Sequence, residues 1–192
     1  FSFQGTIEGC TVGIPGWVNV ENGIAAAAAA LIGGLEPQEV KEALAAFQGV
    51  ERRFDVHINT PKLTYIDDYA HHPTEIEATL NAARNYNKKV WCVFQPHTYT
   101  RTKAFLPEFA KALSLADHVV LADIYAAREK NTIGISSLDL LELVKKEGIP
   151  CDYFPSFDEI ENFLLENCTQ GDLLITMGAG DIVKVGERLL GK

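Results

Sequence analysis

Apolar residues recur along this chain in short runs, and the stretches between the runs have helical spacing. From residue 63 onward, five runs are apolar and partly β-branched, and each is followed by a polar loop and a helical stretch. The runs lie at residues 63–66, 90–94, 119–122, 151–154 and 173–176. Buried runs that alternate with helices are typical of repeated β-α-β units and a mainly parallel sheet.

Helix signals lie where this pattern needs them. Residues 105–113 carry apolar side chains at positions i, i+4, i+7 and i+8, which is the spacing of one helix face. Pro73 suits a first helical position, and Ser156 with Glu159 forms a capping box. With right-handed crossovers, the sequence predicts an α/β fold: a Rossmann-like, mainly parallel sheet of five or six strands flanked by helices.

Residues 1–49 have a different pattern. We expect two short strands within residues 1–14 and helices at residues 19–32 and 37–47, with no sheet for these helices to cover. This piece therefore reads as the tail of a preceding domain, joined near residue 49 to the sheet domain at 50–192. The chain begins with phenylalanine rather than methionine, so we expect a fragment of a longer protein.

Composition excludes several classes of function. The net charge is −9 and the pI is about 5.0, which disfavours nucleic-acid binding because that needs a basic face. The longest apolar run, residues 23–35, is too short for a membrane span, and no signal peptide is visible. The four cysteines form no CxxC pair, and Cys92 and Cys151 lie in predicted strands. We expect buried, reduced thiols in a reducing compartment.

Two polar loops follow predicted strands, at residues 67–75 and 94–102. Open α/β sheets bind ligands at the carboxyl ends of their strands, so we expect a site for a charged small molecule there. In the first loop, an aspartate could accept hydrogen bonds from ligand hydroxyls, or the loop could only cap the helix starting at Pro73. Metal binding is disfavoured because His71 and His72 are adjacent and tend to point apart.

Three arginines and one turn have alternative interpretations. Arg101, near a helix N-terminus that favours an anion, could clamp a carboxylate or form a surface pair with Glu108 or Asp123. The pair at residues 52–53 could form an interdomain salt bridge or reach a phosphate. The glycine-rich turn at 176–181 favours tight backbone packing, and no Gly-x-x-x-x-Gly-Lys-Ser/Thr phosphate loop occurs.

Taken together, these motifs resemble the Mur ligases of peptidoglycan synthesis. They comprise Arg52-Arg53-Phe54, the loops 67–75 and 94–102, Tyr125-Ala126-Ala127-Arg128-Glu129, and residues 177–182, in that order. The resemblance covers essentially the whole chain and is strongest to members that join L-alanine to UDP-N-acetylmuramic acid. It implies a bacterial, cytoplasmic ligase that uses ATP with Mg²⁺. Residues 1–49 would end the central ATPase domain, and 50–192 would be the C-terminal domain.

The resemblance also implies roles for single residues. Asn19 and Asn22 would lie near the adenine, Arg53 would reach the nucleotide phosphates, and Asp68 would bind the ribose. The expected alanine site comprises His72, His97 and Arg101. Of these residues, Arg53, His97 and Arg101 would be catalytic, and no metal ligand is expected in the chain.

Two positions depart from the pattern of the family, and two alternatives remain open. Val18 stands where the family usually has histidine, and Thr98 stands where it often has arginine, which leaves Arg101 as the main cation for the alanine carboxylate. The alternatives are a ligase that recycles murein tripeptide and a stand-alone Rossmann-like nucleotide-binding module. We expect the 192 residues alone to be inactive, because the phosphate loop and the Mg²⁺ ligands implied for the family are absent from them.

Overall fold

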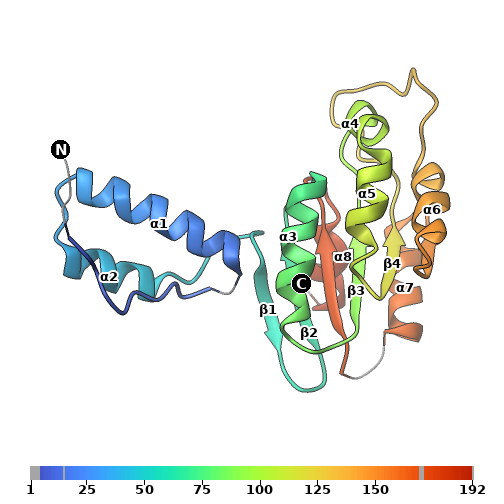
Figure 1. Cartoon of the computed structure of the whole chain (residues 1–192). Helices are drawn as coiled ribbons and strands as arrows, with labels where there is room; N and C mark the ends of the chain where they lie inside the picture. Colours follow the sequence, from blue (N-terminus) through green and yellow to red (C-terminus); the bar gives the residue numbers. More distant parts are fainter. Residues whose placement is uncertain (1–4, 15, 169–170, 192) are drawn as a thin grey trace. The chain divides into compact units, whose positions relative to one another are not determined.

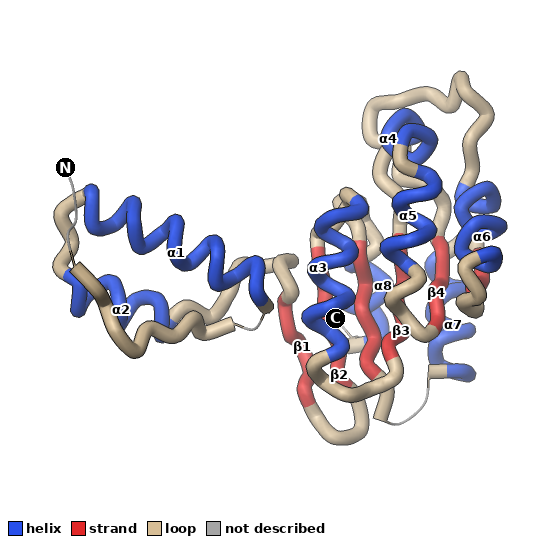
Figure 2. Tube along the Cα trace, viewed as in Figure 1, coloured by secondary structure: helices blue, strands red, loops and turns tan. Residues whose placement is uncertain are grey.

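The computed structural model describes residues 5–14, 16–168 and 171–191, and the chain divides into two compact units, Phe1–Val50 and Glu51–Lys192. Each unit is described by itself (Figure 1). Unit 1 holds two helices, and unit 2 holds the sheet (Figure 2).

Unit 1 is built from α1 (Trp17–Ile32) and α2 (Pro37–Ala46). Residues 23–32 of α1 carry no polar side chain, yet Gly23 is the one residue of this helix classed as buried, and Trp17 and Ile24 are 73% and 65% exposed. A helical segment that is apolar all round is normally buried in a larger core. The short strands expected in residues 1–14 are wrong for the described residues 5–14. These form no strand and are instead held to α2, where the Gly13 N–H donates to the Leu44 carbonyl at 3.1 Å.

Unit 2 contains a six-stranded sheet in the order β1-β2-β6-β3-β4-β5. Four of the five neighbouring strand pairs are parallel, and β1 pairs with β2 in the antiparallel direction. The strands are β1 (Asp55–Asn59), β2 (Thr64–Asp68), β3 (Val90–Phe94), β4 (His118–Leu121), β5 (Cys151–Tyr153) and β6 (Leu173–Met177). The predicted α/β fold with a mainly parallel sheet is therefore confirmed.

Helices cover both faces of this sheet (Figure 1). They are α3 (Pro73–Arg84), α4 (Tyr99–Ala104), α5 (Leu106–Leu113), α6 (Ser137–Lys146), α7 (Phe157–Asn167) and α8 (Val183–Leu189). One core cluster joins α3, α5 and α6 to one face, and a second joins α7 and α8 to the other. Alternate residues of β3 show the division, since Cys92 belongs to the first cluster and Val93 to the second.

The sequence signals used for the helices and cysteines agree with the structure. Pro73 stands in the first turn of α3, and Ser156 caps α7 in a box with Glu159. Cys92 and Cys151 are free and buried, and burial raises the pKa of the Cys151 thiol to about 12. Both thiols therefore stay protonated at neutral pH.

Candidate ligand site at the carboxyl edge of the sheet

The carboxyl ends of three neighbouring strands lie level with one another. Asp68 of β2 and Phe94 of β3 both pair with Met177 of β6, the last residue of that strand. The loops that follow the three strands therefore start at one edge of the sheet. This brings the two polar loops predicted from the sequence together with the glycine-rich turn.

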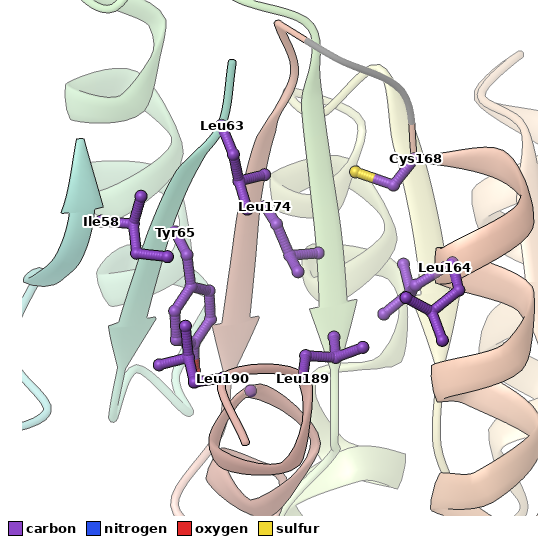
Figure 3. A pocket seen from close by; sticks show the side chains of 10 residues that line it. Ile58, Leu63, Tyr65, Leu164, Cys168, Leu174, Leu189 and Leu190 are labelled. Atoms are coloured by element: carbon purple, nitrogen blue, oxygen red, sulfur yellow. The ribbon is translucent and has the colours of Figure 1, made fainter. Parts of the chain in front are cut away.

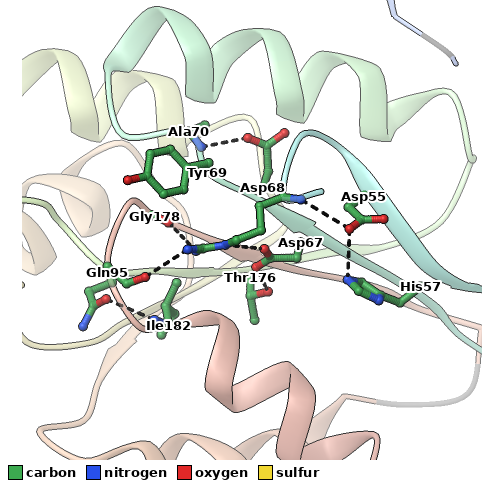
Figure 4. A network of polar contacts seen from close by, with 12 residues as sticks. Asp55, His57, Asp67, Asp68, Tyr69, Ala70, Gln95, Thr176, Gly178 and Ile182 are labelled. Carbon is green, nitrogen blue, oxygen red and sulfur yellow. Dashed lines mark hydrogen bonds and ion pairs between the residues drawn. The ribbon is translucent and has the colours of Figure 1, made fainter. Parts of the chain in front are cut away.

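Asp68 ends β2 with its carboxylate turned into the protein. Oδ1 accepts the Ala70 N–H at 2.7 Å (Figure 4). Oδ2 accepts the Phe54 N–H at 2.9 Å and the Thr79 hydroxyl at 3.1 Å. The residue is 6% exposed. Burial raises the pKa of Asp68 above its ordinary value, and the three hydrogen bonds oppose that rise. The carboxylate thus joins β2 to the start of unit 2 and to α3, whatever else it binds.

The two adjacent histidines begin α3 and point to different neighbours. His72 is the N-cap: its Nδ1 accepts the Thr74 N–H at 3.4 Å, and its ring packs on Phe105 with centroids 4.8 Å apart. His71 turns the other way, and its Nδ1 donates to the Tyr69 carbonyl at 2.9 Å. The interpretation that this loop caps the helix is confirmed for His72.

His97 forms the centre of the second loop. Arg101 Nη1 lies 3.4 Å from its Nδ1, and its ring stacks on Tyr125 with centroids 5.7 Å apart. The His71 ring meets it edge-on at 5.8 Å. Burial, then the positive charge of Arg101, then His71, lower the pKa of His97, and Glu129 opposes them. His97 is therefore neutral at pH 7 and lies beside a fixed cation.

The loop between His97 and α4 carries backbone strain. Thr98 has a φ of 65°, which is unusual for a β-branched residue, and its N–H donates to the Tyr125 carbonyl at 2.9 Å. Two residues further on, the Glu129 carboxylate accepts hydrogen bonds from both the N–H and the hydroxyl of Thr100. These two hydrogen bonds lower the pKa of Glu129. The helix N-terminus that was expected to favour an anion thus holds a carboxylate of the chain itself.

Arg101 is free of the surface pairs that the sequence left open. Asp123 accepts from the Tyr153 hydroxyl instead, and no ion pair joins Arg101 to Glu108 or Asp123 among the described residues. Its guanidinium stays next to His97, in a position to bind a carboxylate.

The glycine-rich turn after β6 is a packing element, as predicted. A Cβ on Gly178 would lie 2.8 Å from the Gln95 carbonyl, and one on Gly180 would lie 2.7 Å from Cγ of Tyr125. Gln95 fixes the same turn, since its Nε2 donates to Asp181 at 3.0 Å and its Oε1 accepts the Ile182 N–H at 3.2 Å.

The remaining predicted residues are divided between the two units. Arg53 is exposed, with its guanidinium carbon 5.5 Å from the centre of the Tyr69 ring. Arg52 forms an ion pair with Asp67 at 2.9 Å, within unit 2. Asn19 and Asn22 are in unit 1, three residues apart on one side of α1.

A separate apolar cavity of about 190 Å³ lies between the sheet and the helices α7 and α8 (Figure 3). Figure 3 shows Tyr65, Leu174 and Leu189 converging on it, and it includes none of the predicted site residues.

Within residues 5–14, 16–168 and 171–191, no group of three or more histidine, cysteine, aspartate or glutamate side chains could hold a metal ion. No helix in that part of the chain is long and apolar enough to cross a membrane.

Sequence reasoning missed several residues of this edge. His71 and Tyr125 contact His97, Glu129 accepts hydrogen bonds from Thr100, and Arg52 binds Asp67. His71 could have been found, because the N-cap position of His72 forces its neighbour to turn away. Tyr125 and Glu129 come from a loop about 30 residues downstream, and no local pattern indicates their contacts.

Fold and site together define a Rossmann-like α/β domain with a cluster of polar side chains at the carboxyl ends of its strands. Residues 52–180 match the model of the family "Mur ligase, glutamate ligase domain", and the chain belongs to that family. It is 58% identical over 181 residues to the UDP-N-acetylmuramate–L-alanine ligase of Agathobacter rectalis and 56% identical to that of Lachnospira eligens. These alignments cover 93% and 94% of the chain, which spans only 39% of either relative's length.

Solved structures agree with this assignment. The UDP-N-acetylmuramate-alanine ligase MurC of Thermotoga maritima superposes with a TM-score of 0.78 at 30% identity, over 95% of this chain and 39% of that one. A murein peptide ligase of Psychrobacter arcticus superposes with a TM-score of 0.69 at 25% identity, over 95% of this chain and 38% of that one.

Proposed function

We propose that this chain is the C-terminal part of a bacterial, cytoplasmic ATP-dependent ligase that joins L-alanine to UDP-N-acetylmuramic acid. The observation that carries the proposal is the 58% identity to a relative of that name over 93% of the chain. Unit 1 would end a central ATPase domain, and the apolar surface of α1 supports this, since such a helix needs a larger core to cover it. The recycling ligase is less favoured, because its structural counterpart is only 25% identical.

The edge around His97 would bind L-alanine. Its carboxylate would pair with Arg101, whose guanidinium offers a planar fork of donors, and with the ring of His97. The amine of alanine must lose a proton before it can attack an acyl phosphate, and a neutral His97 adds no second positive charge beside that amine. His72 would shape the site from the α3 side, through its contact with Phe105.

The first loop and unit 1 would bind ATP. Arg53 is exposed and free to meet the phosphates, and Asn19 with Asn22 offers amide groups on one side of α1 for the adenine. Asp68 would offer its remaining lone pairs to the ribose, in addition to its three internal bonds. The acyl-phosphate chemistry would need Mg²⁺, for which residues outside this chain would be required.

Phosphate release by the gene product that carries this sequence tests the proposal. Release from ATP should require both L-alanine and UDP-N-acetylmuramic acid. Substitution of L-alanine by L-alanyl-γ-D-glutamyl-diaminopimelate separates the two ligases. Release that depended on the tripeptide and not on L-alanine would show that the protein is a recycling ligase instead.

A further inference from the structure

Arg52 is the second residue of unit 2, and its side chain reaches the ligand edge of the sheet. Its Nε donates to Asp67 at 2.9 Å, its Nη2 donates to the Gly178 carbonyl at 2.8 Å, and its Nη1 donates to the Gly180 carbonyl at 3.2 Å (Figure 4). A guanidinium holds its donors in a rigid plane, so three acceptors from two loops fix its orientation. Arg52 thereby ties the end of β2 to the turn after β6.

The network behind Asp67 is buried and directional. Asp67 has no exposed surface, and its Oδ1 accepts the Thr176 hydroxyl at 2.6 Å. The Tyr65 hydroxyl lies 2.8 Å from that of Thr176, and burial raises the pKa of Tyr65. Because the proton of Thr176 goes to Asp67, Tyr65 donates to Thr176. The charge of Asp67 is therefore held in place from one side and paired with Arg52 from the other.

The backbone of Arg52 fixes Tyr69. Arg52 has a φ of 58°, its carbonyl accepts the Tyr69 N–H at 2.7 Å, and its own N–H donates to Asp55 at 3.3 Å. Its guanidinium carbon lies 4.9 Å from the centre of the Tyr69 ring, and that of Arg53 lies 5.5 Å from the same centre. A ring face attracts a cation at this range, so Tyr69 supports both arginines.

We propose that Arg52 is a positioning residue: it fixes Tyr69 and the Gly178–Gly180 turn, so that the exposed guanidinium of Arg53 is held ready for a polyphosphate anion. The proposal rests on the nucleotide role proposed above for Arg53. The two adjacent arginines then have different tasks. Arg52 donates hydrogen bonds to Asp67 and to two backbone carbonyls, whereas the guanidinium of Arg53 is exposed and can meet a ligand.

A double-mutant cycle on ATP affinity tests whether Arg52 acts through Arg53. The dissociation constant of ATP is measured by calorimetry for the 192-residue chain and for Arg52→Lys, Arg53→Ala and the double variant. Lysine keeps the charge but cannot reach three acceptors at once. We expect Arg53→Ala to weaken ATP by about tenfold and Arg52→Lys by about threefold, and the double variant to equal Arg53→Ala. Independent, multiplying effects would overturn the proposal, because a merely structural role would give them.

Amide hydrogen exchange of the ligand-free chain gives a second, independent measurement. Arg52→Lys should speed exchange at the Tyr69 and Gly178 amides relative to Val93 in the middle of the sheet, because the side-chain bonds that hold the backbone of residue 52 and the Gly178 turn in place are lost. Unchanged exchange at both amides would overturn the positioning role. If the wild-type chain bound no ATP, the nucleotide role proposed for this part of the chain would fail, and exchange alone would decide the role of Arg52.

Tyr69→Leu covers the case in which Arg52→Lys does not fold. It removes the ring but keeps the hydrogen bonds of Arg52 to Asp67 and to the turn. We expect about threefold weaker ATP binding, and no further loss when Tyr69→Leu is added to Arg53→Ala. Wild-type affinity in Tyr69→Leu would overturn the proposal.

Discussion

Arg101 Nη1 lies 3.4 Å from Nδ1 of His97, so that a cation and an imidazole face the same edge of the sheet. Because an arginine N–H can only donate, Nδ1 of His97 is the acceptor, and the neutral ring carries its proton on Nε2. His97 can therefore donate from Nε2 while Arg101 keeps other N–H groups free. Two donors of this kind suit a single carboxylate.

Arg101→Ala should impair the use of L-alanine in the gene product that carries this sequence. The carboxylate is the strongest handle of so small a substrate, and loss of one charged contact in a desolvated site costs about 2–4 kcal/mol. We expect the KM for L-alanine to rise by at least about tenfold, measured by steady-state kinetics with each substrate varied in turn. Lys103→Ala, an exposed cation of the same helix, is the control. An effect on ATP alone would place the alanine site elsewhere.

The pKa of His97 should rise in Arg101→Ala. Removal of the positive charge next to the ring favours the protonated form, although burial still lowers the pKa. Titration of the imidazole by NMR in the 192-residue chain measures the shift, and Lys103→Ala should leave the value at that of the wild type. An unchanged value in Arg101→Ala would mean that the two groups do not interact in solution.

The same pKa shift sets the sign of a stability effect. Because the folded state holds His97 neutral, the unfolded chain binds more protons between the lowered folded pKa and about 6.5. The contribution of His97 to the free energy of unfolding therefore rises with pH through that window and is complete above it. The slope of the free energy of unfolding against pH in this window, measured by chemical denaturation at several pH values, should become smaller in Arg101→Ala.

Asp68→Asn should destabilise unit 2 and not only affect a ligand. Two backbone N–H groups and a hydroxyl point at the carboxylate, and an amide would turn its own N–H₂ toward one of them. We expect a loss of about 1–3 kcal/mol in chemical denaturation. Thr79→Val, which removes one hydrogen bond and keeps the carboxylate, should lose only about 1 kcal/mol. Wild-type stability in Asp68→Asn would show that these bonds are weak in solution, and a change in KM for ATP could then be assigned to the ribose directly.

The hydrophobic pattern predicted most of the sheet, because strands buried on both faces are mainly apolar. Residues 90–94 were predicted as a strand, and β3 has these bounds. β1 was missed, since it lies at the edge of the sheet and only Val56 and Ile58 alternate between polar neighbours. Such a five-residue alternation is weak, and the antiparallel pairing with β2 is what makes it a strand.

The sequence predicted the location of the site more readily than the contacts between its side chains. The loops after β2 and β3 follow from the strand order, because parallel strands end at one edge. Which arginine faces inward depends on the positive φ of Arg52, and that conformation is stabilised by Asp67 and Tyr69 rather than by any neighbour in sequence. Long-range contacts of this kind leave no local pattern.

Gly180→Ala should destabilise unit 2 by overpacking. The new methyl group would overlap Oε1 of Gln95 and lie 2.7 Å from Cγ of Tyr125, which stacks on His97. We expect a loss of about 1–3 kcal/mol in the free energy of unfolding, together with changed NMR shifts of the His97 ring. Gly148→Ala is the matched control, because it faces open space and adds only the strain of its φ of +84°, roughly 1–2 kcal/mol. Unchanged His97 shifts in Gly180→Ala would mean that the turn adapts without moving Tyr125.

The 192-residue chain should bind ATP weakly and hydrolyse none of it. Backbone N–H groups of a phosphate loop, its lysine and Mg²⁺ supply most of the grip on a γ-phosphate, and the sequence contains no such loop. Arg53 can attract the phosphates, but without such a loop the γ-phosphate is not held in place for attack. Phosphate release is measured with the purified chain, with and without L-alanine and Mg²⁺. Arg53→Ala distinguishes ATPase activity of the chain from that of a contaminant. Trace activity that is the same in the wild-type chain and in Arg53→Ala comes from an impurity. ATPase activity that survives repurification and falls in Arg53→Ala would show that this domain carries out part of the reaction by itself.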